Sequence, residues 1–196
     1  MTKEPLLGVL LILGTVQYPY MKTVYLFRGG SASGKGSVVP VFAKGLTKPV
    51  VLIEQDKLRW GFHLIGRSWE EVTQEEHRLA HQNTELLYEQ YLKNGSYTIV
   101  VEGLFTWDDT TSSEGSALAL CELAERYKFQ VKNIVLKADK EVMWQRNSLR
   151  QHVVPRSEFD SLYTGVYRTI DPSELVIDST DLSVQDTLKK ITEALR

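Results

Sequence analysis

Hydrophobic residues in this chain are concentrated in five short segments that are bounded by glycine, proline or polar residues. The segments occupy residues 24–27, 49–53, 97–103, 131–136 and 175–178. Apolar runs of this length between turn residues predict β-strands. The third segment is apolar almost throughout, as is typical of a strand that is buried on both faces of a parallel sheet.

Segments with helical periodicity or helix-capping residues separate these strands. A helix is expected from about Val38 to Lys44, with Gly45 as its C-terminal stop. Ser68-Trp-Glu-Glu71 has the pattern of a capping box that opens a long helix ending at Asn94-Gly95. Further helices are expected over residues 117–127, after Asp139 and after Ser183. Strands that alternate with helices predict an α/β fold with an open parallel sheet.

Composition limits the domain organisation and the class of partner. A chain of 196 residues, 42% of them hydrophobic, is long enough for one well-packed domain with a small mobile insert. A net charge of -2 gives no general attraction to nucleic acid or to an anionic membrane. The single cysteine, Cys121, excludes an intramolecular disulfide and lies among leucines, so we expect a buried, inert thiol and a reducing, cytoplasmic location.

The leader, residues 1–20, contains the apolar run Leu6–Leu13. A helix of this run is about 15 Å long at most, against about 30 Å of hydrocarbon in a bilayer, so it cannot span a membrane. It also lacks the alanine cleavage site and the basic start of a signal peptide. The leader is either an added strand or helix, or an extension upstream of a domain that begins at Met21; we favour the extension.

A glycine-rich loop follows the first strand and leads directly into the first helix. Gly29 and the pair Gly34-Lys35 match the Walker A spacing. In such a loop several backbone N–H groups converge, the helix N-terminus adds positive charge, and the lysine reaches the outer phosphates. The expected ligand is ATP or GTP. The residues expected to contact the nucleotide are Gly29, Gly30, Ser31, Ala32, Ser33, Gly34, Lys35, Gly36 and Ser37.

The end of this loop departs from the plain Walker A pattern. Gly36 stands where that pattern has the Mg²⁺-binding hydroxyl, and Ser37 follows one residue later. The ending resembles the Gly-Lys-Gly-Thr of the adenylate-kinase type of loop. A glycine-rich turn with an incidental lysine is the alternative, but it explains neither the preceding strand nor the following helix.

Polar residues stand at the carboxyl ends of the second and third strands. Asp56 and Arg59 follow the second strand, and Glu102 ends the third. The carboxyl ends of parallel strands face the ligand crevice, so these residues are placed for chemistry. His77 and His81, four residues apart on the long helix, have a spacing that suits a metal, but their acidic and basic neighbours favour a solvated face.

Two arginines lie one helical turn apart after the fourth strand. Arg146 and Arg150 share one helix face, without acidic partners four residues away. Arg156 adds a third cation after a short apolar interruption. The pair is either an ordinary solvated face or part of a cationic lid.

Together these motifs resemble the P-loop kinases, and within them the branch that includes polynucleotide 5′-kinase, zeta toxins and chloramphenicol phosphotransferase. The resemblance covers roughly residues 21–196 and rests on the loop 29–37, on Asp56-x-x-Arg59 and on Arg146-Asn-Ser-Leu-Arg150. It implies a three-layer P-loop NTPase fold: a five-stranded parallel sheet flanked by helices, with a small arginine-bearing lid at about residues 146–158.

The resemblance also implies roles for individual residues. Lys35 would contact the β- and γ-phosphates, Asp56 would act on the acceptor hydroxyl, and Arg59 would hold the acceptor. Arg146 and Arg150 would close over the nucleotide as a lid.

Two assignments stay open: which residues hold Mg²⁺, and which carboxylate is the catalytic base. Because Gly36 replaces the usual hydroxyl, Mg²⁺ is expected on Ser37, on water or on Glu102. Glu102 is also the rival of Asp56 as the catalytic base, and it lies on the acceptor side of the crevice.

The chemistry that follows is Mg-ATP-dependent transfer of the γ-phosphoryl group to a hydroxyl, which needs positioning and charge neutralisation more than covalent help. A small molecule is favoured as the acceptor. A nucleic-acid 5′-hydroxyl is the second possibility, and a nucleotide-dependent switch without an acceptor is the third. No membrane partner is expected.

Overall fold

A five-stranded parallel sheet forms the centre of the structure, a computed structural model that describes residues 22–46, 49–62, 71–150 and 153–196. The strands are β1 (Thr23–Arg28), β2 (Val50–Glu54), β3 (Thr98–Gly103), β4 (Gln130–Lys137) and β5 (Leu175–Asp178). Their order across the sheet is β2-β3-β1-β4-β5, and every neighbouring pair is parallel. The predicted strands and the parallel sheet are therefore confirmed.

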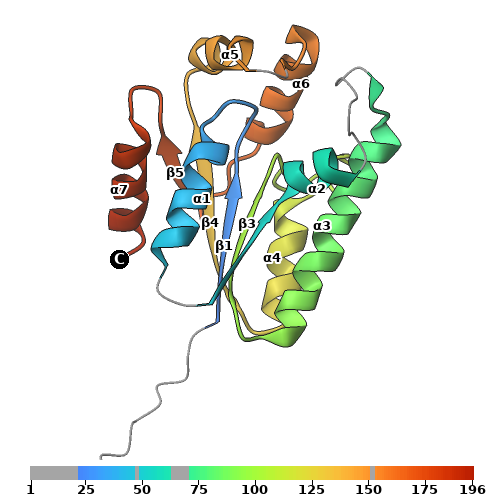
Figure 1. The fold of residues 1–196 in the computed structure, drawn as a ribbon, viewed down its shortest axis with the longest axis vertical. Helices are drawn as coiled ribbons and strands as arrows, with labels where there is room; N and C mark the ends of the chain where they lie inside the picture. The colour runs from blue at the N-terminus through green and yellow to red at the C-terminus, as the bar shows by residue number, and fades with distance from the viewer. Residues whose placement is uncertain (1–21, 47–48, 63–70, 151–152) are drawn as a thin grey trace, which may run out of the picture.

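Helices cover both faces of this sheet and give the three layers (Figure 1). They are α1 (Lys35–Gly45), α2 (Gln55–Phe62), α3 (Gln74–Asn94), α4 (Ala117–Arg126), α5 (Lys140–Ser148), α6 (Arg156–Tyr167) and α7 (Val184–Ala194). Helices α1 and α7 pack on one face, and α3 and α4 pack on the other. None of the helices within the described ranges combines the length and the apolar character that crossing a membrane requires.

The two faces of the sheet enclose separate hydrophobic cores. On the side of α3 and α4, Tyr88, Leu92 and Leu120 pack against β1 and β3. On the side of α1 and α7, Phe42 and Ile191 pack against the sheet. All six residues of β3 are buried, as its sequence predicts, because the strand lies between the two cores.

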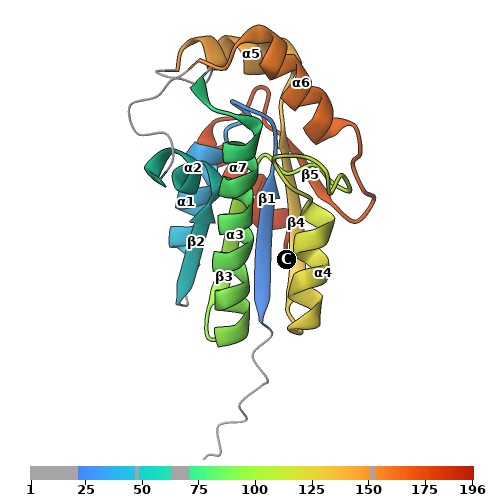
Figure 2. The ribbon, with the colours of Figure 1, turned by 90° about the vertical axis from the view of Figure 1, so that its right-hand side faces the viewer.

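Helices α5 and α6 lie across the carboxyl ends of the strands (Figure 2). They share a small core of their own, in which Met143, Val154 and Phe159 are buried. Helix α6 is not among the elements expected from the sequence, and neither is α2, which begins directly where β2 ends. The described residues of the predicted lid therefore belong to a helical pair that extends well beyond residue 158.

Residues near the C-terminal end of α6 hold the start of the glycine loop in place. The buried Arg28 side chain donates to both carboxylate oxygens of Glu174, at 2.5 Å each, and to the carbonyl of Thr169 at 2.8 Å. The Tyr167 hydroxyl accepts from the backbone N–H of Gly30 at 2.8 Å and donates to the carbonyl of Leu136 at 2.7 Å. The loop conformation thus depends on a segment far along the chain.

The long helix α3 starts later than the sequence analysis expects. Thr73 is its N-cap, and a complete capping box joins Thr73 and Glu76. Most of the predicted box, residues 68–70, lies outside the described residues, and Glu71 precedes the helix. The predicted end is confirmed, because Gly95 caps the helix with a φ of 70°. The leader, residues 1–20, also lies outside the described residues.

Candidate active site

The glycine loop between β1 and α1 has a conformation that its glycines permit. Gly34 has a φ of 98°, which is the left-handed region that favours glycine. At Gly29 a Cβ atom would lie 2.4 Å from the carbonyl oxygen of Leu136, so a side chain there would collide with β4. The loop can therefore lie close against the sheet and turn its backbone N–H groups toward a bound anion.

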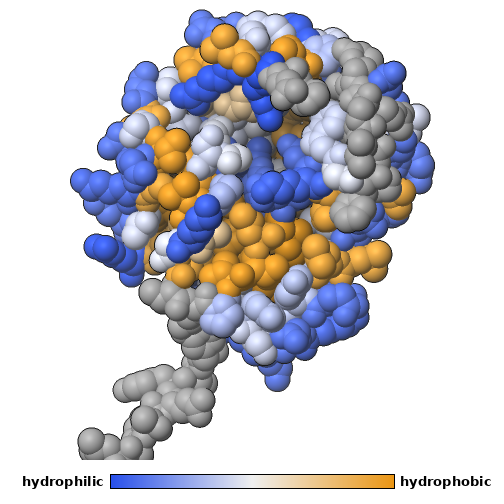
Figure 3. Space-filling model, in the orientation of Figure 1, coloured by the Kyte–Doolittle hydropathy of each residue, from blue (hydrophilic) through white to orange (hydrophobic). Residues whose placement is uncertain are grey.

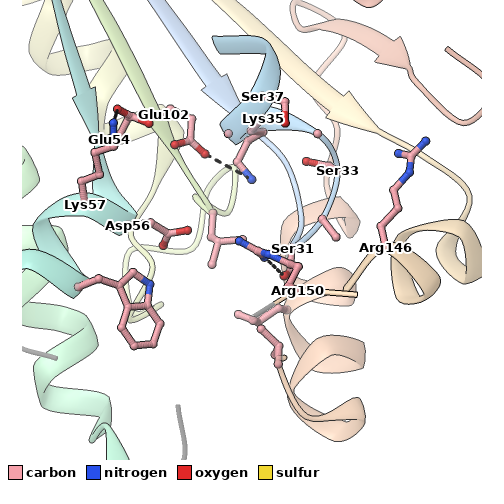
Figure 4. Close-up of a pocket in the computed structure, with 17 residues that line it drawn as sticks. Ser31, Ser33, Lys35, Ser37, Glu54, Asp56, Lys57, Glu102, Arg146 and Arg150 are labelled. Atoms are coloured by element: carbon pink, nitrogen blue, oxygen red, sulfur yellow. Dashed lines mark hydrogen bonds and ion pairs between the residues drawn. The ribbon is translucent and has the colours of Figure 1, made fainter. Parts of the chain in front are cut away.

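Lys35 is the first residue of α1, and its side chain folds back over this loop. Its Nζ atom donates to the carbonyls of Gly29 at 2.6 Å and Gly30 at 3.2 Å. It also lies 3.6 Å from Oε1 of Glu102, at the end of the neighbouring strand β3 (Figure 4). The structure thus places the lysine and the Glu102 carboxylate together. They meet because the loop after β1 and the end of β3 lie at the same edge of the sheet.

The Glu102 carboxylate lies in an unusual electrostatic environment. Burial raises its pKa to about 7, and the ammonium of Lys35 opposes that shift only in part. The carboxylates of Asp56 and Glu54 raise the pKa of Glu102 further. Because the charged form is disfavoured, this carboxylate gains from any cation that approaches it.

A cleft of about 660 Å³ opens beside these residues at the carboxyl ends of the strands. The glycine loop and the first turn of α1 form one wall, and Glu54, Asp56, Lys57 and Trp60 form another. Figure 3 shows a hollow with hydrophilic residues around it beneath α5 and α6. A cleft of this size suits a small organic ligand.

Asp56 and Arg59, which the sequence analysis pairs as acceptor-side residues, lie in different surroundings. The Asp56 side chain is 43% exposed and lines the cleft. The Arg59 side chain is 0% exposed, and its guanidinium lies between Asp56 Oδ1 at 2.7 Å and Glu114 Oε2 at 2.5 Å. Because its side chain is buried, Arg59 does not reach the cleft in this structure, where it is expected to hold the acceptor. It instead hydrogen-bonds the Asp56 carboxylate from inside the protein.

His77 and His81 are buried, which contradicts the expectation of a solvated helix face. The His77 Nδ1 atom lies 3.9 Å from Glu114, and burial together with Arg59 lowers the pKa of His77 to about 4. The His81 ring packs against Gly115, where a Cβ atom would lie 1.9 Å from His81 Cε1. These histidines belong, with Arg59, Glu114 and Gly115, to a group of buried residues that we call the layer behind Asp56.

Two of the three arginines in the predicted lid line the cleft. The Arg146 guanidinium donates to the carbonyls of Ser179 and Thr180, and Arg150 donates to the Ser31 hydroxyl of the glycine loop at 3.1 Å. Arg156 instead pairs with Glu141 and Asp160 on the outer surface of the lid and stacks over the Trp144 ring. The expectation that Arg156 joins the cationic cluster is wrong.

The region that contains this cleft matches a family model. The match is to the family described as AAA domain and covers residues 24–166, from β1 to the end of α6. The chain belongs to this AAA-domain family. None of the curated proteins compared with the chain matches it.

Solved structures share the fold of this family member at low sequence identity. A putative kinase from Chloroflexus aurantiacus j-10-fl has 20% identity and a TM-score of 0.61, over 89% of this chain and 96% of the other. A sugar kinase from Janibacter sp. HTCC2649 has 17% identity and a TM-score of 0.58, over 89% and 94%. A gluconokinase from Sinorhizobium meliloti 1021 has 18% identity and a TM-score of 0.55, over 89% and 96%. These likenesses confirm the predicted P-loop fold.

The oxygen ligands in the cleft of this AAA-domain protein fit a magnesium ion that is shared with phosphates. Ser37 is exposed in the cleft, and the Glu102 carboxylate lines the same space. Among the described residues no group of three or more His, Cys, Asp or Glu side chains could hold a metal alone. Magnesium commonly takes one or two carboxylates and completes its shell with water and phosphate oxygens, so this set is sufficient.

Several residues of this site are not among those predicted from the sequence. Glu54 and Lys57 line the cleft, and their position at the end of β2 is a signal that could have found them. Leu104, Val154 and Leu162 add apolar lining. Glu114 gives no such signal, because it comes from a loop of small residues and reaches Arg59 only through the fold. His63 and Arg67, which the sequence order places near Trp60, lie outside the described residues.

Proposed function

We propose that this protein is an ATP-dependent phosphotransferase that moves the γ-phosphoryl group to a hydroxyl of a small molecule. One observation carries the proposal: Lys35 of the glycine loop and the partly exposed carboxylate of Asp56 face the same cleft. A phosphate-binding cation and a hydroxyl-activating carboxylate are the two groups that this reaction needs on opposite sides of the transferred phosphoryl.

Each residue then has a role in positioning or in neutralising charge. The loop N–H groups and Lys35 bind the phosphates, and Arg146 and Arg150 close over them from the lid. Ser37 and Glu102 would hold Mg²⁺, which when bound spreads the negative charge of the β- and γ-phosphates. Asp56 orients the acceptor hydroxyl and takes its proton.

The acceptor is proposed to be small because the cleft must hold the phosphates and the acceptor in about 660 Å³. The names of two structures that share the fold, a sugar kinase and a gluconokinase, support a small-molecule acceptor without fixing its charge. The resemblance to the polynucleotide-kinase, zeta-toxin and chloramphenicol-phosphotransferase branch stays a prediction.

The test is transfer of label from γ-labelled ATP to a panel of hydroxyl compounds and 5′-hydroxyl oligonucleotides. Lys35→Ala should reduce transfer by orders of magnitude and leave the circular dichroism spectrum unchanged, because an ammonium over a glycine loop stabilises the transition state. Lys44→Ala, which removes an exposed lysine at the other end of α1, is the matched control. Full transfer by Lys35→Ala would disprove the role of the loop, and nucleotide binding without any transfer would favour a switch.

A further inference from the structure

The two sides of the cleft differ in the charge that they offer to a ligand. Lys35, Arg146 and Arg150 belong to the side built from the glycine loop and the lid. Glu54, Asp56, Lys57 and Trp60 belong to the side built from β2 and α2, which we call the acceptor side. Figure 4 shows Glu54, Asp56 and Lys57 across the cleft from Arg146.

Each cation on the acceptor side that the structure describes is already bound to a carboxylate. Lys57 forms an ion pair with Glu54, three residues earlier. Arg59, immediately behind the cleft wall, contacts two carboxylates, Asp56 and Glu114. The Arg59 guanidinium is therefore engaged by two carboxylates, and its side chain is buried away from an acceptor anion.

On the described part of the acceptor side, an acceptor therefore meets carboxylates and cations that are already paired with each other. A carboxylate or phosphate on the acceptor would approach Glu54 and Asp56, and it would have to share the exposed ammonium of Lys57 with Glu54. Like charges at close range cost free energy that water in a narrow cleft does not fully screen. The cations of the opposite side are needed for the phosphates of the nucleotide.

The same groups are suited to hydroxyl compounds. Ionised carboxylates only accept hydrogen bonds, and a polyol offers several O–H donors. Trp60 lines the cleft beside Asp56 and is the largest apolar side chain there, so it gives the carbon skeleton of such a compound a surface to pack on. An amine on the acceptor would be attracted by the carboxylates.

We propose that the phosphate acceptor is a polyhydroxyl compound without negative charge, either uncharged or cationic. This inference rests on the proposed phosphotransferase function and narrows its substrate class. It excludes sugar acids, sugar phosphates and 5′-hydroxyl oligonucleotides as good acceptors, because each brings an anion to the acceptor side.

The first experiment compares acceptors that share a skeleton and differ in charge. Glucose and glucosamine are matched with gluconate, and thymidine is matched with a 5′-hydroxyl oligothymidylate, within a wider polyol library sorted by charge. Label from γ-labelled ATP should reach uncharged or cationic members, with kcat/KM at least about tenfold above their anionic counterparts. That factor corresponds to one unit-charge interaction across about 12 Å at an effective dielectric constant of ~20.

The outcomes separate the two proposals. Transfer mainly to anionic members would overturn the charge inference and leave the phosphotransferase function intact. Transfer to no hydroxyl at all, with ATP binding retained, would overturn both. Transfer to uncharged or cationic members supports both.

The second experiment changes the charge of the acceptor side directly. Glu54→Gln removes one carboxylate and releases Lys57 from its ion pair. The inhibition constant of the anionic counterpart against the uncharged acceptor should fall about tenfold. Glu89→Gln is the matched control, because it also removes a glutamate paired with a nearby lysine, Lys93, but on α3 outside the cleft lining. Equal inhibition constants in both variants would show that the carboxylates of the acceptor side do not select the acceptor.

Discussion

Two buried arginines, Arg28 and Arg59, lie behind the two sides of the cleft. They differ in whether any residue that they contact is exposed in the cleft. Arg28 closes β1 and is bound by Glu174 and by backbone carbonyls, all within the interior. Arg59 in α2 is bound by Glu114 in the interior and by Asp56, whose side chain is 43% exposed in the cleft. Burial alone therefore does not separate an arginine whose contacts stay in the interior from one that contacts a residue of the cleft wall.

Mutations in the two regions should therefore have different effects. Disruption around Arg28 should appear mainly as lost folding stability, because neither Arg28 nor its partners Glu174 and Thr169 line the cleft. Disruption around Asp56 and Arg59 should appear as lost turnover.

Asp56→Asn should have the largest effect on turnover. The substitution keeps the shape of the side chain and removes the proposed base, so transfer should fall about 10² to 10⁴-fold, the usual range for a positioned general base. ATP affinity, measured by calorimetry, should be unchanged, as should the melting temperature. Full activity of Asp56→Asn would instead point to Glu102 as the base. It would also show that the region of Asp56 and Arg59 does not serve turnover.

Arg28→Met should have the largest effect on stability. The variant leaves the Glu174 carboxylate buried without its cation, and breaking a buried ion pair in this way costs about 3–5 kcal/mol. Urea unfolding measures the change, and Glu174→Gln in the same chain should restore part of it. A variant that is as stable as the wild type would show that this buried pair does not hold the glycine loop.

The site region should also make stability depend on pH. Glu102 has a raised pKa of about 7 in the folded state, so between pH 4.5 and 7 the folded state binds more protons than the unfolded state. The free energy of unfolding should therefore fall as the pH rises through this window, by up to about 3 kcal/mol. Glu102→Gln should remove that fall, as urea unfolding at pH 5 and pH 8 would show.

His77 provides the opposing slope. Its pKa is lowered to about 4, so the unfolded state binds more protons between pH 4 and 6.5, and stability is lost as the pH falls through that window. In Glu102→Gln only this acid-side loss should remain, whereas in His77→Asn only the alkaline-side loss should remain. If both variants keep the pH profile of the wild type, neither group titrates as its burial implies.

Arg59→Lys should have the smallest effect. A lysine keeps the charge but cannot bridge two carboxylates with a planar fork, so kcat should fall about tenfold, or about 1.4 kcal/mol. The acceptor KM should not change, because Arg59 does not line the cleft. In an Asp56→Asn background the same substitution should cost almost nothing more. A raised acceptor KM would restore Arg59 as the residue that holds the acceptor.

The sheet and the glycine loop could be predicted because their signals are local. Apolar runs with sharp ends identify all five strands, and Gly29, Gly34 and Lys35 stand at fixed offsets from β1. The carboxyl-end rule then places Asp56 and Glu102 at one edge without any knowledge of the topology.

The start of α3 shows a limit of local signals. Ser68 with Glu71 and Thr73 with Glu76 have the same capping-box pattern, and the sequence offers no reason to choose the second. Helix α6 is a different case, because Phe159, Leu162, Tyr163 and Val166 repeat with helical spacing after Pro155 and could have predicted it.

The layer behind Asp56 could not be predicted because it depends on tertiary contacts. The buried face of α3 presents His77, His81 and Thr84, which a hydropathy pattern assigns to solvent. The two histidines are buried against the loop that carries Glu114 and Gly115, and that loop shows no pattern of its own. The burial of Arg59 follows from the same loop.

The hold of residues 167–174 on the glycine loop has a consequence for synthesis on the ribosome. The ion pair between Arg28 and Glu174 can form only after Glu174 has been synthesised, 146 residues after Arg28. At ~5–20 residues per second that interval is about 7–30 s, during which β1 and its loop have been made but lack their final contacts. A nascent chain of this protein is therefore expected to expose the apolar strand β1 to chaperones for most of its translation, and to become able to bind nucleotide only near the end.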